Sequence, residues 1–140
     1  MEVAEKRPKL VSFRALAFQG ENRSPATAGQ RWTFQMTQTI QVGLTVPAAP
    51  GGILQAVVLI GFVSNASNES LPAQKAEFRA DYEAKFDYPA LVTEADVSQA
   101  ITLEPYQYIL VAQAFPLAMT HFRRAMESMG FDAREMPLGI

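Results

Sequence analysis

The chain has 140 residues, of which 49% are hydrophobic and 19% are charged, and its formal net charge is −2. A chain of this length and composition forms one globular domain with a sizeable core. Its small acidic excess excludes the clustered basic surface that is typical of nucleic-acid binding. The absence of cysteine excludes disulfides and thiolate metal sites, which fits a reducing compartment.

The start of the chain predicts a flexible leader over residues 1–9, followed by a single domain over residues 10–140. The leader carries charges and a proline instead of the apolar stretch that a signal peptide needs. The longest apolar run, Ile53–Val63, is about half as long as a bilayer span. We therefore expect a cytoplasmic protein without membrane insertion.

Four β-strands are predicted in the first two thirds of the chain, at Leu10–Gln19, Gln30–Val46, Ile53–Ser64 and Ala73–Tyr88. The second and fourth have apolar side chains at every second position, which puts those side chains on one face of a strand. These positions are Trp32, Phe34, Met36, Ile40, Val42, Leu44 and Val46, then Ala76, Phe78, Ala80, Tyr82, Ala84, Phe86 and Tyr88. Short polar turns between successive strands favour an antiparallel meander. Its apolar face must be covered by helices, because its other face is polar.

The hydrophobic period changes after Pro89. Thr93 and Asp96 resemble a capping box, so we expect a short helix from Glu94 to about Thr102. From Tyr108 the apolar positions alternate in steps of four and three, which predicts a long helix. This seam comprises Tyr108, Ala112, Phe115, Met119, Phe122, Met126 and Met129. Pro116 predicts a kink or a fresh helix start, and Gly130 a C-cap.

The resulting fold class is α+β, with a four-stranded antiparallel sheet followed by a short helix and a long C-terminal helix. The long helix also carries Leu117, Ala118 and Ala125 outside the seam. A helix that is apolar on more than one side needs a second partner, so we expect an oligomer.

No catalytic motif interrupts this pattern, and we expect neither enzymatic activity nor a cofactor. His121 is the only histidine and lies off the seam, so we interpret it as a surface or interface residue. Gly51 and Gly52 precede a strand and lack the Lys-Ser/Thr of a phosphate loop. The carboxylates of strand four alternate with Lys75, Arg79 and Lys85. This alternation is typical of a solvated, charge-balanced sheet face, with a protein docking surface as the alternative.

Several segments resemble the SecB-type protein-export chaperone family. They are Val11-Ser12-Phe13, Trp32, the stretch Tyr108–Ala118 with its Phe115-Pro116 step, Met129-Gly130-Phe131, and Met136-Pro137-Leu138. The resemblance implies an ATP-independent holdase that binds unfolded or nascent polypeptides and assembles as a homotetramer, a dimer of dimers packed through helices. It also implies docking on the export motor ATPase.

On this resemblance we predict two groups of site residues. The client-binding group is Phe86, Tyr88, Leu91, Met119, Phe122 and Met126, and the partner-docking group is Glu77, Arg79 and Asp81. The family places a carboxylate in the fourth strand, where this chain has Arg79, with Glu77 two residues away.

Two other functions stay open at this point. The first is an adaptor dedicated to one partner, such as a toxin–antitoxin chaperone or a phage- or plasmid-borne interaction protein. The second is a small-molecule-binding or enzymatic domain with a pocket between sheet and helix, for which the sequence offers no convergent polar cluster.

Overall fold

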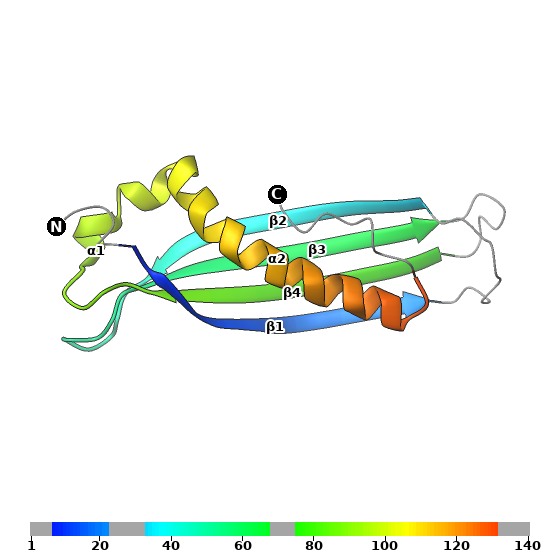
Figure 1. Cartoon of the computed structure of the whole chain (residues 1–140), viewed down its shortest axis with the longest axis horizontal. Helices are drawn as coiled ribbons and strands as arrows, with labels where there is room; N and C mark the ends of the chain where they lie inside the picture. The colour runs from blue at the N-terminus through cyan, green and yellow to red at the C-terminus, as the bar shows by residue number, and fades with distance from the viewer. Residues whose placement is uncertain (1–6, 23–32, 68–74, 132–140) are drawn as a thin grey trace.

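The computed structural model describes residues 7–22, 33–67 and 75–131 as a four-stranded antiparallel sheet with a long helix across one face (Figure 1). The elements are β1 (Lys9–Asn22), β2 (Thr33–Thr45), β3 (Gln55–Ser67), β4 (Lys75–Asp87), α1 (Glu94–Val97), the 3-10 helix η2 (Ala100–Thr102) and α2 (Glu104–Ser128). This order confirms the predicted α+β fold. Residues 1–6 of the expected leader, Trp32, and Met136-Pro137-Leu138 lie outside the described residues.

The strand order differs from the predicted meander. It is β1-β4-β3-β2, so β2, β3 and β4 form a meander while β1 pairs with β4. The long connection between β1 and β2 allows the chain to pass from one edge of the sheet to the other, which a short turn would forbid. β1 and β2 are therefore the two edge strands.

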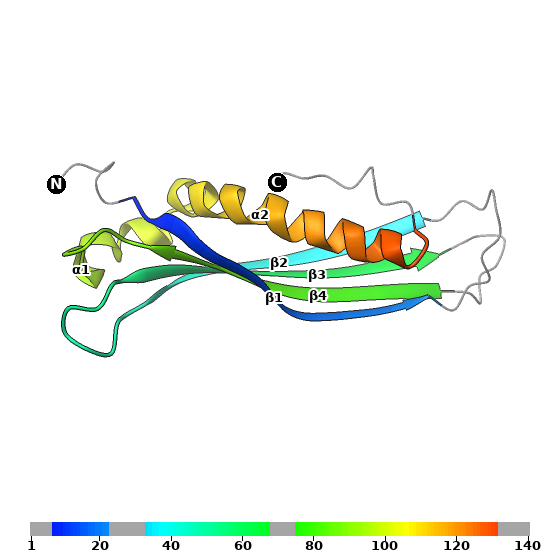
Figure 2. The same ribbon diagram turned by 60° about the horizontal axis from the view of Figure 1, so that its bottom comes forward.

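The core lies between α2 and the sheet face formed by alternate residues of β3 and β4 (Figure 2). Phe62 of β3 is fully buried and contacts the rings of Tyr82, Phe115 and Phe122. The C-terminal part of the predicted seam packs on the period-two rows of the sheet, through Phe115, Met119, Phe122 and Met126. The prediction is wrong for the start of the seam, because Tyr108 and Ala112 are exposed.

Helix α2 runs through Pro116 without a fresh start. Proline has no N–H to donate to the carbonyl of Ala112. Ala112 lies on the exposed side of the helix. The short helix is capped as predicted, because the backbone N–H of Thr93 donates to Asp96 Oδ2 at 2.8 Å.

The C-terminal end of α2 is fixed by a Schellman motif. Gly130 has a φ of 95°, and the backbone N–H groups of Gly130 and Phe131 donate to the carbonyls of Glu127 and Met126. The side chain of Asn22 donates from Nδ2 to the Met129 carbonyl at 2.8 Å, which ties this end to β1. The prediction of Gly130 as the helix stop is confirmed.

The other face of the sheet carries no helix among the described residues (Figure 2). Its polar side chains pair across strands: Arg14 Nε lies 2.9 Å from Glu83 Oε1, and the neutral amide of Gln55 donates from Nε2 to Asp87 Oδ1 at 2.7 Å. The predicted polar row of β4 is exposed or half-buried here from Glu77 to Asp87, with Val57, Leu59 and Val63 of β3 beside it. We call this surface the open face.

Candidate polypeptide-binding surface

Five of the six residues predicted to bind a client lie in the core. Their exposed fractions are 2% or less: Phe86, Tyr88, Met119, Phe122 and Met126. Such side chains cannot touch a client in this conformation. Met119, Phe122 and Met126 face the sheet from α2, whereas Phe86 lies in β4 and Tyr88 directly follows that strand. The structure therefore places all five residues in the core.

Leu91 is the exception, because 90% of its surface is exposed. It follows β4 in a turn closed by a hydrogen bond from the Val92 N–H to the Pro89 carbonyl, at 3.3 Å. The φ of Leu91 is 76°, the value required at the third position of a type II turn, where glycine is favoured. A branched apolar side chain is therefore held in solvent at a backbone cost of roughly 1–2 kcal/mol. Such strain is typical of positions kept for function.

The replacement Leu91→Gly is expected to raise the free energy of unfolding by about 0.5 kcal/mol, because relief of strain exceeds the added chain entropy. Urea unfolding measures the change. The matched control Ala90→Gly lies in the same turn at a negative φ and should lower the stability by a similar amount. If Leu91→Gly also suppresses client aggregation as well as the wild type, Leu91 does not contact clients.

A half-exposed apolar row follows the inner face of β2. The row comprises Phe34, Met36, Ile40, Val42 and Leu44, which pack against the core but stay only partly buried. Helix α2 packs on β1, β3 and β4, whereas β2 meets η2. In Figure 1 the helix crosses the sheet diagonally, ending over β1. We call these five side chains the inner face of β2.

Within residues 7–22, 33–67 and 75–131, no strand pairs with the outer edge of β2, and this edge lacks the usual protection. All of its residues pair with β3 in one uninterrupted register, and none of them is charged or proline. The opposite edge strand differs, because β1 has two register shifts and carries Lys9, Arg14 and Glu21. Charges, prolines and bulges protect edges from strand addition. By this criterion the edge of β2 can accept an extended polypeptide, whereas the edge of β1 is protected from strand addition.

Part of the evidence for an apolar, unprotected β2 was present in the sequence. The period-two row of β2 was correctly predicted to be apolar, but it was interpreted as core. Only the strand order shows that β2 is an edge and that the helix lies over its neighbours. The absence of charge and proline over Thr33–Thr45 could have indicated an unprotected strand.

Two buried tyrosines link the sheet to the helical layer. The Tyr82 hydroxyl lies 2.7 Å from Nδ1 of His121, and the Tyr88 hydroxyl pairs with that of Tyr106. His121 therefore has a structural partner, and its ring also contacts Phe18 edge-on. Burial raises the pKa of Tyr82 and of Tyr88 well above the ordinary value, and the Tyr106 hydroxyl adds to the rise at Tyr88.

Both raised pKa values make stability fall in alkali. The unfolded chain releases these protons near pH 10, the ordinary tyrosine pKa, whereas the folded chain retains them. The contribution of these two tyrosines to the free energy of unfolding should therefore be constant below about pH 10 and fall above it by about 1.4 kcal/mol per pH unit for each tyrosine. Urea unfolding at pH 8 and pH 11 tests this. The double variant Tyr82→Phe/Tyr88→Phe should show a shallower fall, and an identical fall would contradict the assignment.

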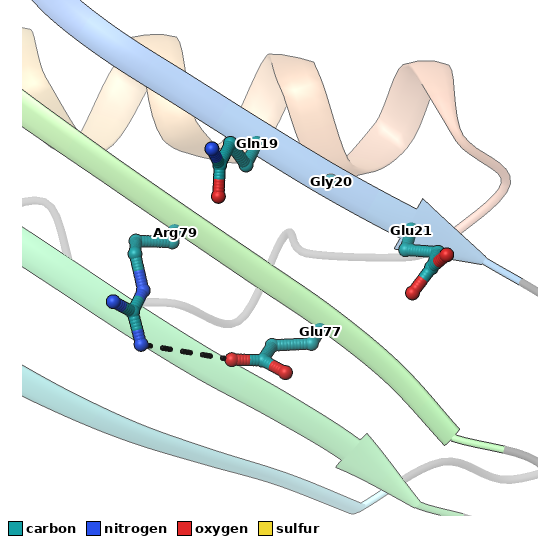
Figure 3. A pocket seen from close by; sticks show the side chains of 5 residues that line it. All are labelled: Gln19, Gly20, Glu21, Glu77 and Arg79. Carbon is teal, nitrogen blue, oxygen red and sulfur yellow. Dashed lines mark ion pairs between the residues drawn. The ribbon is translucent and has the colours of Figure 1, made fainter.

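The residues predicted to dock a partner lie on the open face of β4. Glu77 Oε1 and Arg79 Nη2 are 3.8 Å apart, and Asp81 is exposed in the same row. Together with Gln19, Gly20 and Glu21 of β1, Glu77 and Arg79 line a hollow of about 480 Å³ (Figure 3). The hollow is open to solvent and mixes both charges, so it suits a polar surface contact better than an enclosed ligand.

The described residues offer no metal site and no membrane-spanning helix. Within residues 7–22, 33–67 and 75–131, no three His, Cys, Asp or Glu side chains gather closely enough to hold a metal ion. None of the helices described has the length and apolar character needed to cross a membrane.

Comparison with known proteins shows the fold. The structure is similar to a SecB-like chaperone of Mycobacterium tuberculosis, solved in complex with a ChAD peptide from the HigA1 antitoxin. The TM-score is 0.62 at 17% sequence identity, and the match covers 92% of this chain and 88% of the other. No family model matches the chain, and no curated protein sequence does. The sheet and long helix are therefore SecB-like.

Proposed function

We propose that this protein is an ATP-independent chaperone, a holdase that binds non-native polypeptide along β2. One observation carries the proposal: the inner face of β2 is apolar and half-exposed, beside a free edge with no charge, proline or bulge. An extended client can add backbone hydrogen bonds at this edge and bury alternate side chains on the inner face. Such binding needs neither nucleotide nor a catalytic group, and we propose that the protein is not an enzyme.

The fold neighbour supports the polypeptide-binding part of this proposal. That SecB-like chaperone was solved with a peptide from an antitoxin. The same comparison supports a second candidate equally well, namely an adaptor dedicated to one partner. The two differ in breadth, because a holdase protects many unrelated chains and an adaptor binds one tightly.

We further propose a homotetramer that acts in the cytoplasm, with protein export as one possible setting. The outward side of α2 exposes Tyr108, Ile109 and Leu117, an apolar surface that a second copy could cover. The cysteine-free sequence fits a reducing compartment. Docking of the export motor ATPase on Glu77, Arg79 and Asp81 also stays a proposal, and light-scattering mass in solution tests the assembly.

Suppression of aggregation tests the function. Several unrelated, chemically unfolded proteins are diluted into buffer containing this protein without ATP, and light scattering is followed. A holdase should suppress the scattering of most of them at near-stoichiometric amounts, with no change when ATP is added. Suppression of none, by a protein shown to be folded by circular dichroism, would contradict the holdase and favour the single-partner adaptor.

A further inference from the structure

At the end of α2 the chain turns back to the sheet and reaches it beside β2. The Schellman motif at Gly130 reverses the chain direction, and Phe131 is buried immediately afterwards. The ring of Phe131 meets Phe34 of β2 at 5.8 Å and Phe78 of β4 at 5.3 Å, both edge-on. The described part of the chain therefore ends beside the Thr33 end of the inner face of β2.

The nine residues that follow, Asp132–Ile140, have the composition of a client. Met136, Leu138 and Ile140 occupy every second position, which places them on one side of an extended segment. Fully extended, the stretch from Phe131 to Leu138 spans about 24 Å. The stretch from Phe34 to Ile40 along β2 spans about 20 Å. Leu138 can therefore reach Ile40, in the middle of the inner face.

A buried hydroxyl marks the start of this path. Ser64 of β3 is fully buried on the inner side of the sheet, where Met36 and Phe78 are its cross-strand neighbours. Its Oγ has no hydrogen-bond partner among the residues that the structure describes. A buried hydroxyl without a partner costs about 1–3 kcal/mol, and a backbone carbonyl of an adjacent extended segment would remove this cost.

From these observations we infer that the C-terminal segment, residues 132–140, binds the inner face of β2 as an internal client and competes with external ones. The inference rests on the proposed function, because it assigns the same surface to both. An unfolded client displaces the segment, while folded proteins, which lack an extended apolar stretch, leave it in place. Because the segment is tethered, its local concentration at the inner face of β2 is high. Even with a low affinity it therefore prevents the binding of clients whose own affinity is low.

Disulfide cross-linking in the full chain tests the inference, since the natural sequence has no cysteine to interfere. The variant Ile40→Cys/Leu138→Cys places one thiol on the inner face of β2 and one in the segment. The matched control Gln41→Cys/Leu138→Cys moves the first thiol by one residue to the open face. Under mild oxidation, only the first pair should form an intramolecular disulfide, seen as a faster-migrating monomer on a non-reducing gel. An equal yield in both pairs, or no disulfide in either, would overturn the placement.

Competition is measured on the same variant with a fluorescent apolar peptide as the probe. Excess peptide should lower the yield of the disulfide several-fold, and an unchanged yield would overturn the competition. Leu138→Asp in the otherwise natural chain should tighten peptide binding by about threefold to tenfold, the effect of one buried side chain. Failure of this inference can be distinguished from failure of the proposed function. If the disulfide forms but the wild-type protein neither binds the peptide nor suppresses aggregation, the holdase proposal fails while the segment's position stands.

Discussion

Replacing Met119 with aspartate is expected to lower the free energy of unfolding by more than about 4 kcal/mol. Met119 is 0% exposed between α2 and the sheet, so the change removes apolar packing and buries a carboxylate. A loss of this size is a large fraction of the total stability of about 5–15 kcal/mol that is typical of a small domain. Circular dichroism during urea unfolding measures the effect.

The control for this variant is Gln113→Asp, on the exposed side of the same helix. It introduces the same side chain in the same element, and it should cost no more than about 1 kcal/mol. If Met119→Asp were as stable as this control, the helical seam would not face the sheet. Loss of client binding in a well-folded Met119→Asp variant would return the seam to the binding surface, as the sequence first indicated.

The double replacement Ile40→Thr/Val42→Thr is expected to weaken client binding by at least about tenfold. Threonine keeps the β-branched shape that suits a strand, so β2 should persist while its inner face loses apolar surface. Each lost apolar contact contributes about 1 kcal/mol or more, and tenfold corresponds to about 1.4 kcal/mol. Fluorescence anisotropy of a labelled unfolded peptide gives the affinity.

A matched control makes the same chemical change on the opposite side of the sheet. Val57→Thr/Val63→Thr alters two half-buried residues of β3 on the open face. This variant should bind the peptide as the wild type does. Equal weakening in both variants would indicate a general loss of stability, and weakening in the control alone would move the binding surface to the open face.

The two hydrophobic periods in the sequence were sufficient to predict the elements. The period-two rows around Ile40 and Phe78 lie in strands and the seam through Phe122 lies in a helix, as predicted. The row around Ile40 and the start of the seam are less buried than expected. A period states which side chains share a face, because it follows from backbone geometry alone. It does not state what covers that face, so buried and exposed parts of the same row could not be separated.

The binding surface depended on information that a period does not contain. Which strand lies at an edge is decided by pairing between distant segments. A simple meander would pair β1 with β2, whereas here β1 pairs with β4, which leaves β2 at the edge of the described sheet. The positive φ of Leu91 could not be predicted either, because leucine rarely adopts that conformation and no glycine marks the position in the sequence. Both features come from tertiary structure overriding local preference.

Hydrogen exchange with and without an unfolded client tests the central claim most directly. Among the described residues, no strand pairs with the backbone amides of β2 that face away from β3, so these amides should exchange readily in the free protein. Client addition should slow exchange in the peptide covering Thr33–Thr45 and leave the β1 peptide, Lys9–Asn22, unchanged. Slowed exchange in β1 alone, or no change in either edge strand while a client is bound, would contradict strand addition at β2.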